Sequence, residues 1–311
     1  MASVSGLHPD ALFPDYAFAD PPPDRADHLR DDLAALRALW PEAGVLLIDD
    51  DSHAVAAVGT QDLWLPRGDE LAAQLPEDAN FLALYQGRGW FALRRKDAHT
   101  VDMQRIDLLA AALTLPPLQA GLYAHARALL HWQATHRYCG RCGAPVQPIR
   151  AGHAARCTGC GVEHYPRTDT AVIVAVTDGE RLLLGRQASW PLRRYSVIAG
   201  FLEPGERLED AVVREVLEET GLRVRACSYA ASQPWPFPAN IMVGFEAEAN
   251  GDPPIVGSEL EDARWFSAAE IHAGIAAGEL LLSPRLSISS WLIRRWLAQH
   301  ADSVGGKSDL P

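Results

Sequence analysis

A run of spaced glycines and glutamates between residues 200 and 222 constrains the fold and the chemistry of this chain more than any other sequence feature. After the loop GFLEPGE, the segment ERLEDAVVREVLEETG has the apolar spacing of an amphipathic helix, and Gly221 supplies its stop signal. Glu215, Glu218 and Glu219 are separated by three and four positions, so they project from one face of that helix. The sequence therefore predicts a glycine-rich turn that leads into a helix with three carboxylates on one face.

Three carboxylates on one face repel one another. A solvated surface helix tolerates such a cluster, but a divalent cation would turn the same oxygens into ligands, and oxygen-only ligand sets favour Mg²⁺ or Mn²⁺. Such ions activate water and neutralise phosphate charge. Arg214, next to Glu215, can pair with a glutamate of the cluster and position it. The helix therefore predicts metal-assisted chemistry on a phosphate group.

Four of the five cysteines form two CxxC pairs, Cys139 with Cys142 and Cys157 with Cys160, and a glycine follows each pair. Two such turns can bring four thiolates onto one ion in a closed tetrahedral shell, which predicts one structural zinc. Iron accepts the same four sulfurs, so both metals stay open at this point. Cys227 stands alone in a predicted strand and is expected to be a small buried residue.

Composition narrows the class of protein further. The 311 residues are 48% hydrophobic and 22% charged, with a net charge of -12, which argues against a generally basic nucleic-acid binder. The N-terminal residues show no basic segment followed by an apolar one, and the longest apolar runs, such as residues 171–176, are too short to cross a bilayer. These features predict a cytoplasmic protein with no membrane partner.

Short apolar runs between turn residues predict a mixed α/β domain over residues 1–136, followed by the cysteine module at 137–165. Within the first domain we expect helices at 26–39 and over most of 104–136, and strands at 44–48, 62–65, 81–85 and 89–93. A second α/β domain is predicted over 166–300, with two further helices at 267–277 and 286–300. Residues 301–311 are expected to form a disordered tail.

The spaced residues around the glutamate helix resemble the signature of the Nudix hydrolase superfamily at Gly200, Glu206, Arg214, Glu215, Glu218, Glu219 and Gly221. The resemblance implies an α/β/α sandwich with a mixed sheet that hydrolyses a nucleoside diphosphate linked to another group. It also implies that Glu215 and Glu219 bind metal and that Glu218 and Arg214 support them in catalysis.

The stretch SQPWPFP at residues 232–238 places three prolines and two aromatic rings within seven residues, which excludes a helix or an interior strand. In so proline-rich a loop, core packing of Trp235 and Phe237 is not expected, and the rings suit stacking on a base. With the cysteine module and the glutamate helix, this stretch resembles the NADH pyrophosphatase (NudC-type) branch of the superfamily over roughly residues 130–300, and more weakly through LWLPRG at 63–68. That branch cleaves NAD(H) to NMN(H) and AMP, can remove NAD caps from RNA 5′ ends, and is typically homodimeric.

Carried over by position, the resemblance implies that Glu215, Glu219 and Glu259, with the carbonyl of Ala199, hold two or three Mg²⁺ or Mn²⁺ ions. Glu219 would also orient or deprotonate the attacking water. The residues expected to contact substrate are Tyr165, Phe201, Ser232, Gln233, Pro234, Trp235, Pro236, Phe237, Pro238, Ala239, Asn240 and Ser289. Packing is the alternative role for Tyr165 and Phe201.

Three positions depart from the branch and bear on its specificity: Asn240 replaces a serine, Gly152 replaces an acidic residue that some members carry, and Ser289 replaces a frequent alanine.

Two other functions stay open. One is a Nudix enzyme that prefers ADP-ribose or dinucleoside polyphosphates, and the other is a non-catalytic module that binds RNA ends. The arginines at 141, 150, 156 and 167 could form a local RNA-binding patch or could be solvated surface charge.

Overall fold

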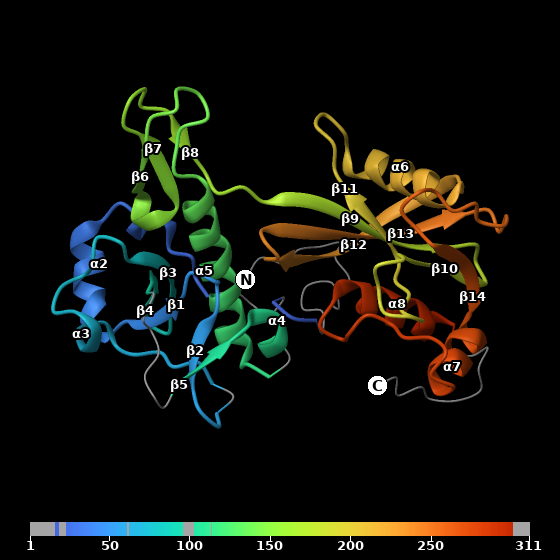
Figure 1. Ribbon diagram of the computed structural model, residues 1–311, viewed down its shortest axis with the longest axis horizontal. Coiled ribbons are helices and arrows are strands. Elements are labelled where there is room, and N and C mark those ends of the chain that lie inside the picture. The colour runs from blue at the N-terminus through green and yellow to red at the C-terminus, as the bar shows by residue number, and fades with distance from the viewer. Residues whose placement is uncertain (1–15, 19–22, 61, 96–102, 113, 301–311) are drawn as a thin grey trace. The chain divides into compact units, whose positions relative to one another are not determined.

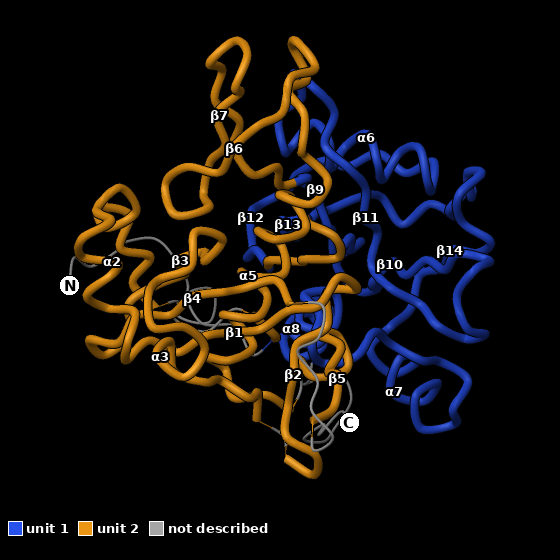
Figure 2. The backbone as a smooth tube through the Cα atoms, turned by 60° about the vertical axis from the view of Figure 1, so that its left-hand side comes forward, with its two compact units in different colours: residues 1–16, 169–233, 240–311 blue, residues 17–168, 234–239 orange. Residues whose placement is uncertain are grey.

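The computed structural model describes residues 16–18, 23–60, 62–95, 103–112 and 114–300. Contacts divide the chain into two units: unit 1 comprises residues 1–16, 169–233 and 240–311, and unit 2 comprises residues 17–168 and 234–239 (Figure 2). The predicted tail at 301–311 lies outside the described residues. Within the described ranges, no helix is long and apolar enough to cross a membrane.

Unit 2 is built on a five-stranded sheet with the order β3-β4-β1-β2-β5 (Figure 1). The strands are β1 (Gly44–Ile48), β2 (Ala54–Ala57), β3 (Asn80–Tyr85), β4 (Arg88–Arg94) and β5 (Met103–Ile106). β1 runs parallel to β4, and the other neighbours are antiparallel. The helices are α2 (Leu33–Leu39), α3 (Gly68–Leu71), α4 (Leu108–Ala111) and α5 (Pro117–Thr135), with short 3-10 turns at Asp27–Leu29 and Trp40–Glu42.

Both faces of this sheet are buried, which explains the continuous apolar run in β1. Leu46 and Ile48 belong to a core cluster with residues of α5, whereas Val45 and Leu47 pack in a second cluster with residues of α2. Alternate side chains of a strand point to opposite faces, so a strand covered on both sides is apolar at every position. Unit 2 therefore has its sheet between two helical layers.

Several local expectations for this unit are confirmed and others are wrong. Strands form at 44–48, 81–85 and 89–93 as predicted, but residues 62–65 form no strand, and Leu63 makes only an isolated bridge to Ala56. β2 was not expected, and β5 occupies residues assigned to a helix. These two short strands pair with each other, so a cross-strand ladder decided their conformation. The predicted helix at 26–39 begins only at Leu33, where the Asp32 carboxylate accepts the N–H of Ala35 at 2.9 Å.

The cysteine module forms a three-stranded antiparallel sheet of β6 (Val146–Ile149), β7 (Ala154–Cys157) and β8 (Glu163–His164), with a 3-10 turn at Arg150–Gly152. Cys139 and Cys142 precede β6, Cys157 ends β7, and Cys160 lies in the turn before β8. The contacts group this ribbon with unit 2.

Unit 1 is an α/β/α sandwich with a mixed sheet in the order β12-β13-β9-β10-β14, and β11 pairs with β9. Its strands are β9 (Asp169–Thr177), β10 (Arg181–Arg186), β11 (Ile198–Phe201), β12 (Val224–Trp235), β13 (Asn240–Ala249) and β14 (Asp262–Ser267). Its helices are α6 (Leu208–Thr220), α7 (Ala268–Ala276) and α8 (Ile288–Gln299). β9 is parallel to β13 and antiparallel to β10 and β11.

α6 covers one face of this sheet and α8 covers the other (Figure 1). Val172 and Val174 of β9 share a core cluster with Val212 and Val216 of α6. On the α8 face, a Cβ on Gly244 would lie 2.9 Å from Ile288, so a glycine permits the close approach. The predicted fold class is confirmed, and α6 ends as expected, with Gly221 at φ 69° and its N–H bonded to the Leu217 carbonyl at 2.8 Å.

Candidate active site

The glycine at the start of the glutamate motif leaves space for a carboxylate. A Cβ built on Gly200, in β11, would lie 1.8 Å from Cδ of Glu215 and 2.1 Å from each of its carboxylate oxygens. Any side chain at position 200 would therefore displace Glu215. The close approach places the first glutamate of α6 directly against the backbone of β11, the strand that also contains Ala199.

Arg214 joins the loop before α6 to the helix itself. Its guanidinium donates to both carboxylate oxygens of Glu206, at 2.8 and 2.9 Å, and to the Phe201 carbonyl at 2.8 Å. It also donates to Glu215 at 2.7 Å and to Glu218 at 3.1 Å. The expectation that Arg214 pairs with a glutamate of the cluster is confirmed. The fork to Glu206 is a further contact, which spacing alone did not predict.

Two of the helix carboxylates are buried among like charges. Glu215 and Glu219 are 8% and 5% exposed. Burial raises the pKa of Glu219 to about 8, and the negative charges of Glu215, Glu259 and Glu218 add to that shift. Burial also raises the pKa of Glu215, although Arg214 opposes the shift. A positive charge among these oxygens would offset both the desolvation and the mutual repulsion of the two carboxylates, so the pair fits a divalent cation.

The loop that contains Glu259 lies against the C-terminal end of α6. Ile255 donates its N–H to the Thr220 carbonyl at 2.8 Å, and Gly257 donates to the Glu219 carbonyl at 2.9 Å. A Cβ on Gly257 would lie 2.4 Å from the Glu218 carbonyl oxygen, so only glycine allows this approach. The fold therefore brings a carboxylate 40 positions along the chain towards the helix cluster.

Oxygens of Glu215, Glu219 and Glu259 do not all lie within 4.8 Å of one another. Within the described ranges, only two groups meet that limit, the four cysteines and the trio Asp49, Asp51 and His53. The set of the three carboxylates is all-oxygen and partly buried, which suits Mg²⁺ or Mn²⁺ as ligand chemistry.

The segment expected to be a loop extends β12 as far as Trp235, at the edge of the sheet, and turns only at residues 236–239. Residues Pro234–Ala239, called the aromatic loop, group with unit 2. Phe237 packs against the core cluster of that unit, with the Phe18 ring 6.5 Å away, so the expectation that Phe237 avoids core packing is wrong. Trp235 is half-buried and lies edge-on to Phe237 at 5.0 Å. Pro234 and Pro238 are exposed, whereas Pro236 is buried and Ala239 is half-buried.

The remaining predicted substrate residues occupy varied environments. The buried Gln233 side chain donates to the Leu286 carbonyl at 2.7 Å and accepts the Ile288 N–H at 2.8 Å, so both of its polar ends have partners at the start of α8. Within unit 1, Ser232 is half-buried, Asn240 begins β13 opposite Asp169, and Phe201 is 57% exposed at the end of β11.

Two further predicted contacts are polar side chains with partners of their own. Ser289 is buried, with its hydroxyl 2.7 Å from that of Ser196. Tyr165, in unit 2, is 59% exposed and donates its hydroxyl to Glu163 at 2.8 Å. The Tyr165 ring is therefore accessible to a ligand, whereas the Ser289 hydroxyl is buried beside that of Ser196.

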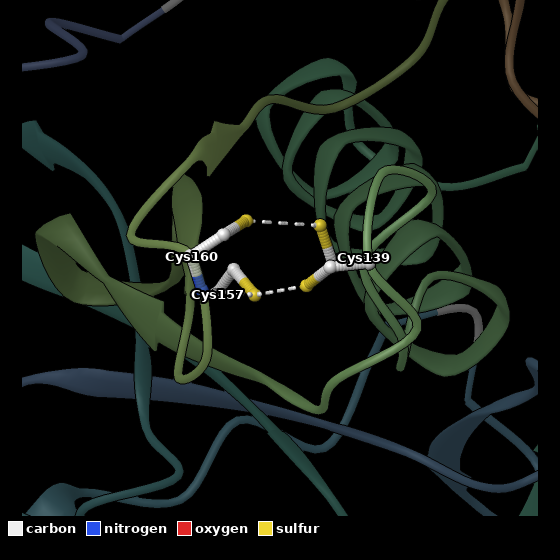
Figure 3. Close-up of side chains that lie close together, drawn as sticks. Cys139, Cys157 and Cys160 are labelled. Carbon is white, nitrogen blue, oxygen red and sulfur yellow. Dashed lines mark hydrogen bonds between the residues drawn. The ribbon is translucent and has the colours of Figure 1, made fainter.

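The four cysteines converge as predicted, each contributing a sulfur within 4.8 Å of the others (Figure 3). The two CxxC turns are equivalent: Gly143 and Gly161 have φ values of 74° and 73°, and their N–H groups bond to the Cys139 and Cys157 carbonyls. The Arg141 N–H contacts the Cys139 sulfur at 3.4 Å and lowers the pKa of that thiol to about 6. Backbone donors lower the pKa of the Cys157 thiol in the same way, first the Cys160 N–H and then that of Gly159. Backbone donors thus favour thiolates, the form that zinc binds, at Cys139 and Cys157. At Cys142 the Ala144 N–H lowers the pKa of the thiol, but hydrogen bonds with the Cys157 and Cys160 sulfurs outweigh that lowering and raise the pKa to about 11.

Arg150 and Arg156, both considered for an RNA-binding patch, already have carboxylate partners. Arg150 pairs with Asp27 at 2.9 Å and with Asp31 at 3.2 Å, and Arg156 pairs with Glu163 at 2.7 Å. These pairs reduce the positive charge that the ribbon offers to a phosphate backbone.

Family models cover most of the chain. Residues 42–132 match the NADH pyrophosphatase-like rudimentary NUDIX domain, residues 134–165 the NADH pyrophosphatase zinc ribbon domain, and residues 166–286 the NUDIX domain. Together with the sandwich of unit 1 and its glutamate helix, these matches define the class as a Nudix hydrolase.

Curated relatives match across the domains. A protein of Mycobacterium bovis (strain BCG / Pasteur 1173P2) named NAD-capped RNA hydrolase NudC is 39% identical over 291 residues, 88% of this chain and 92% of that one. A protein of the same name from Stutzerimonas stutzeri (strain A1501) is 42% identical over 180 residues, 58% of this chain and 62% of that one. The chain therefore belongs to the NADH pyrophosphatase (NudC) family.

Proposed function

We propose that this protein hydrolyses the pyrophosphate bond of NAD(H), giving NMN(H) and AMP, and that it also removes NAD caps from RNA 5′ ends. Membership of the family supports the reaction, and the curated relatives named NAD-capped RNA hydrolase support the second substrate. The observation that most supports catalysis is the close contact between the Glu215 carboxylate and Gly200, beside the buried Glu219.

Two or three Mg²⁺ or Mn²⁺ ions are the proposed cofactors, and Glu215, Glu219, Glu259 and the Ala199 carbonyl are the groups that would hold them. When bound, such ions supply positive charge for the pyrophosphate oxygens and lower the pKa of a bound water. Arg214 positions Glu215 and Glu218 through its contacts with both, and Gly200 leaves the space that the Glu215 carboxylate occupies.

Hydrolysis forms a bond between a water oxygen and one phosphorus and breaks the bond from that phosphorus to the bridging oxygen. The bridging oxygen leaves on the phosphate of the other nucleotide. Glu219 is the group proposed to orient the water and accept its proton, because it is buried within the cluster. Beside a cation its carboxylate would be ionised and able to act as that base.

The other parts of the chain have supporting roles in this proposal. One zinc holds the ribbon through Cys139, Cys142, Cys157 and Cys160. The residues proposed to contact the nucleotide are those of the aromatic loop, with Tyr165, Phe201, Ser232, Gln233, Asn240 and Ser289. The chain is proposed to act as a cytoplasmic homodimer, with domains at residues 1–136, 137–165 and 166–300.

The direct test is incubation of purified protein with NADH and Mg²⁺ or Mn²⁺, with NMNH and AMP measured by chromatography. The same assay with NAD⁺, ADP-ribose, a dinucleoside polyphosphate and NAD-capped RNA ranks the substrates. Glu219→Gln should abolish turnover while the thermal unfolding transition is retained. Glu209→Gln is the matched control, because Glu209 is exposed on the same helix and outside the cluster. Full activity in Glu219→Gln, or preference for another substrate, would contradict the proposal.

A further inference from the structure

We infer that Arg127, on α5 of unit 2, is a positioning residue for the aromatic loop: it holds Phe237, and through Phe237 it orients the Trp235 ring towards a flat heteroaromatic ring of the substrate. The inference rests on the proposed function, because the loop has this role only if the substrate is a nucleotide. Arg127 belongs to the N-terminal domain, more than a hundred positions before the loop.

One side chain contacts two consecutive residues of the loop. Nη1 of Arg127 donates to the Pro236 carbonyl, and the guanidinium carbon lies 4.7 Å from the centroid of the Phe237 ring. Proline has no backbone N–H, so a carbonyl is the only polar backbone group that Pro236 can offer. A planar guanidinium can donate in its own plane and stack on a ring with its face, which an ammonium group cannot do.

The contacts with the aromatic loop are the main compensation for the partly buried charge of Arg127. No Asp or Glu of the described residues lies within ion-pair distance of its guanidinium. Burial lowers the pKa of Arg127, with Tyr123 and Asp107 acting against that shift. A partly buried cation without a carboxylate partner is costly unless other groups compensate. The Pro236 carbonyl and the Phe237 face provide that compensation, so removal of Arg127 should release the loop.

The contact passes from Phe237 to Trp235. Phe237 contacts both the Arg127 guanidinium, at 4.7 Å, and the Phe18 ring, at 6.5 Å, and its own N–H bonds to the Trp235 carbonyl at 2.7 Å. The Trp235 ring meets Phe237 edge-on at 5.0 Å and 62°, and it is only half-buried. Phe237 thus supports the Trp235 ring, and the part of the Trp235 ring that stays exposed is available to a ligand.

A positioning role of this kind affects substrate binding more than bond cleavage. Stacking a base on an aromatic side chain is worth about a five- to 150-fold change in affinity by alanine substitution. Loosening the ring without removing it should lose part of that range. We expect Arg127→Ala to raise the KM for NADH by about five- to 30-fold and to change kcat by less than about threefold.

The test compares kcat and KM for NADH in Arg127→Ala, Arg127→Lys and Arg94→Ala. Arg94 is the matched control, because it also donates to a carbonyl in unit 2, that of Leu130 on α5 at 2.8 Å, whereas its partners among the described residues lie outside the aromatic loop. Arg127→Lys keeps the charge without the planar face and should fall between wild type and Arg127→Ala. Should the alanine variant fail to fold, the lysine variant gives the same comparison.

A double-mutant cycle separates positioning from general destabilisation. If Arg127 acts through Trp235, Arg127→Ala should change KM less than about twofold in a Trp235→Ala background. An unchanged KM in the single variant, or an undiminished effect in that background, would overturn the inference. If wild-type protein cleaves no dinucleotide, the proposed function fails instead.

In that case, hydrogen exchange over residues 235–240 tests the positioning role. Arg127→Ala should accelerate this exchange and Arg94→Ala should not, and equal exchange in both variants would overturn the inference.

Discussion

Substitution of Gly200 by alanine tests the arrangement of the glutamate cluster most directly. The new Cβ would lie 1.8 Å from Cδ of Glu215, whereas ordinary contact begins at 3.4 Å, so the carboxylate would have to retreat by about 1.6 Å. Glu215 is 8% exposed and bonded to Arg214 at 2.7 Å, so it has little room for that movement. A misplacement of about 1 Å in a catalytic site can cost about 100-fold in rate.

We therefore expect Gly200→Ala to lower kcat/KM for NADH by about 100-fold or more, with a loss of about 1–3 kcal/mol in the free energy of unfolding from overpacking. The assay is steady-state hydrolysis of NADH with saturating Mg²⁺, together with equilibrium denaturation in urea. Both measurements are needed, because a large loss of activity with a small loss of stability identifies displacement of a carboxylate rather than unfolding.

Gly205→Ala is the matched control in the same loop. Gly205 has φ +86° and no atom within 4 Å of its ideal Cβ position, so alanine there strains the backbone by about 1–2 kcal/mol without touching a carboxylate. Its kcat/KM should stay far above that of Gly200→Ala. If Gly200→Ala retains kcat/KM within about threefold of wild type, the argument that Glu215 must lie against residue 200 is refuted.

Three further predictions concern the metals and the helix cluster. Cys157→Ser should lower bound zinc well below one equivalent and disorder the ribbon, because the metal and the fold are coupled; metal analysis that found a full equivalent would contradict this. Because burial raises the pKa of Glu219 to about 8 from an ordinary 4.5, its protonated form stabilises the metal-free fold below about pH 4.5, and that contribution is lost as the pH rises through about 8. Without added Mg²⁺, and without a chelator that would remove the ribbon zinc, the melting temperature should fall over this range. Mg²⁺ should raise it more at about pH 9 than at about pH 6; an equal increment would argue against the assignment. Arg214→Lys should lower kcat/KM by about tenfold or more, because an ammonium group cannot replace the fork to Glu206 and the contact with the Phe201 carbonyl; a rate equal to wild type would refute the positioning role.

Much of the local structure around the site was predictable because short-range spacing determines it. Glu215, Glu218 and Glu219 share a helix face through helical periodicity, and a glycine ends that helix. The CxxCG pattern likewise determines each cysteine turn, since Gly143 and Gly161 both adopt positive φ. A strand that is covered on both faces, such as β1, can be predicted from sequence because it is a continuous apolar run.

Other features depended on partners distant in the chain. β5 was assigned to a helix because its residues acquire an extended form only through pairing with β2. The proline-rich sequence predicts Phe237 outside the core, yet its ring packs against the core of unit 2 and contacts Phe18 and Arg127. No local pattern marks Arg127 as a neighbour of residues 236 and 237, because that contact is made by elements more than a hundred positions apart.

The sequence by itself determined the chemistry that the site offers, namely carboxylates on one helix face, four thiolates in two turns, and two rings in a stiff loop. Helical and turn geometry are local, so residue type and spacing were sufficient for these. The tertiary structure decided which groups are buried, and burial changes their chemistry. Glu219 has a raised pKa because packing removes it from water beside Glu215, and a side chain at position 200 would displace the Glu215 carboxylate that lies against Gly200. Desolvation and close approach depend on which surfaces meet, and only the folded chain brings those surfaces together.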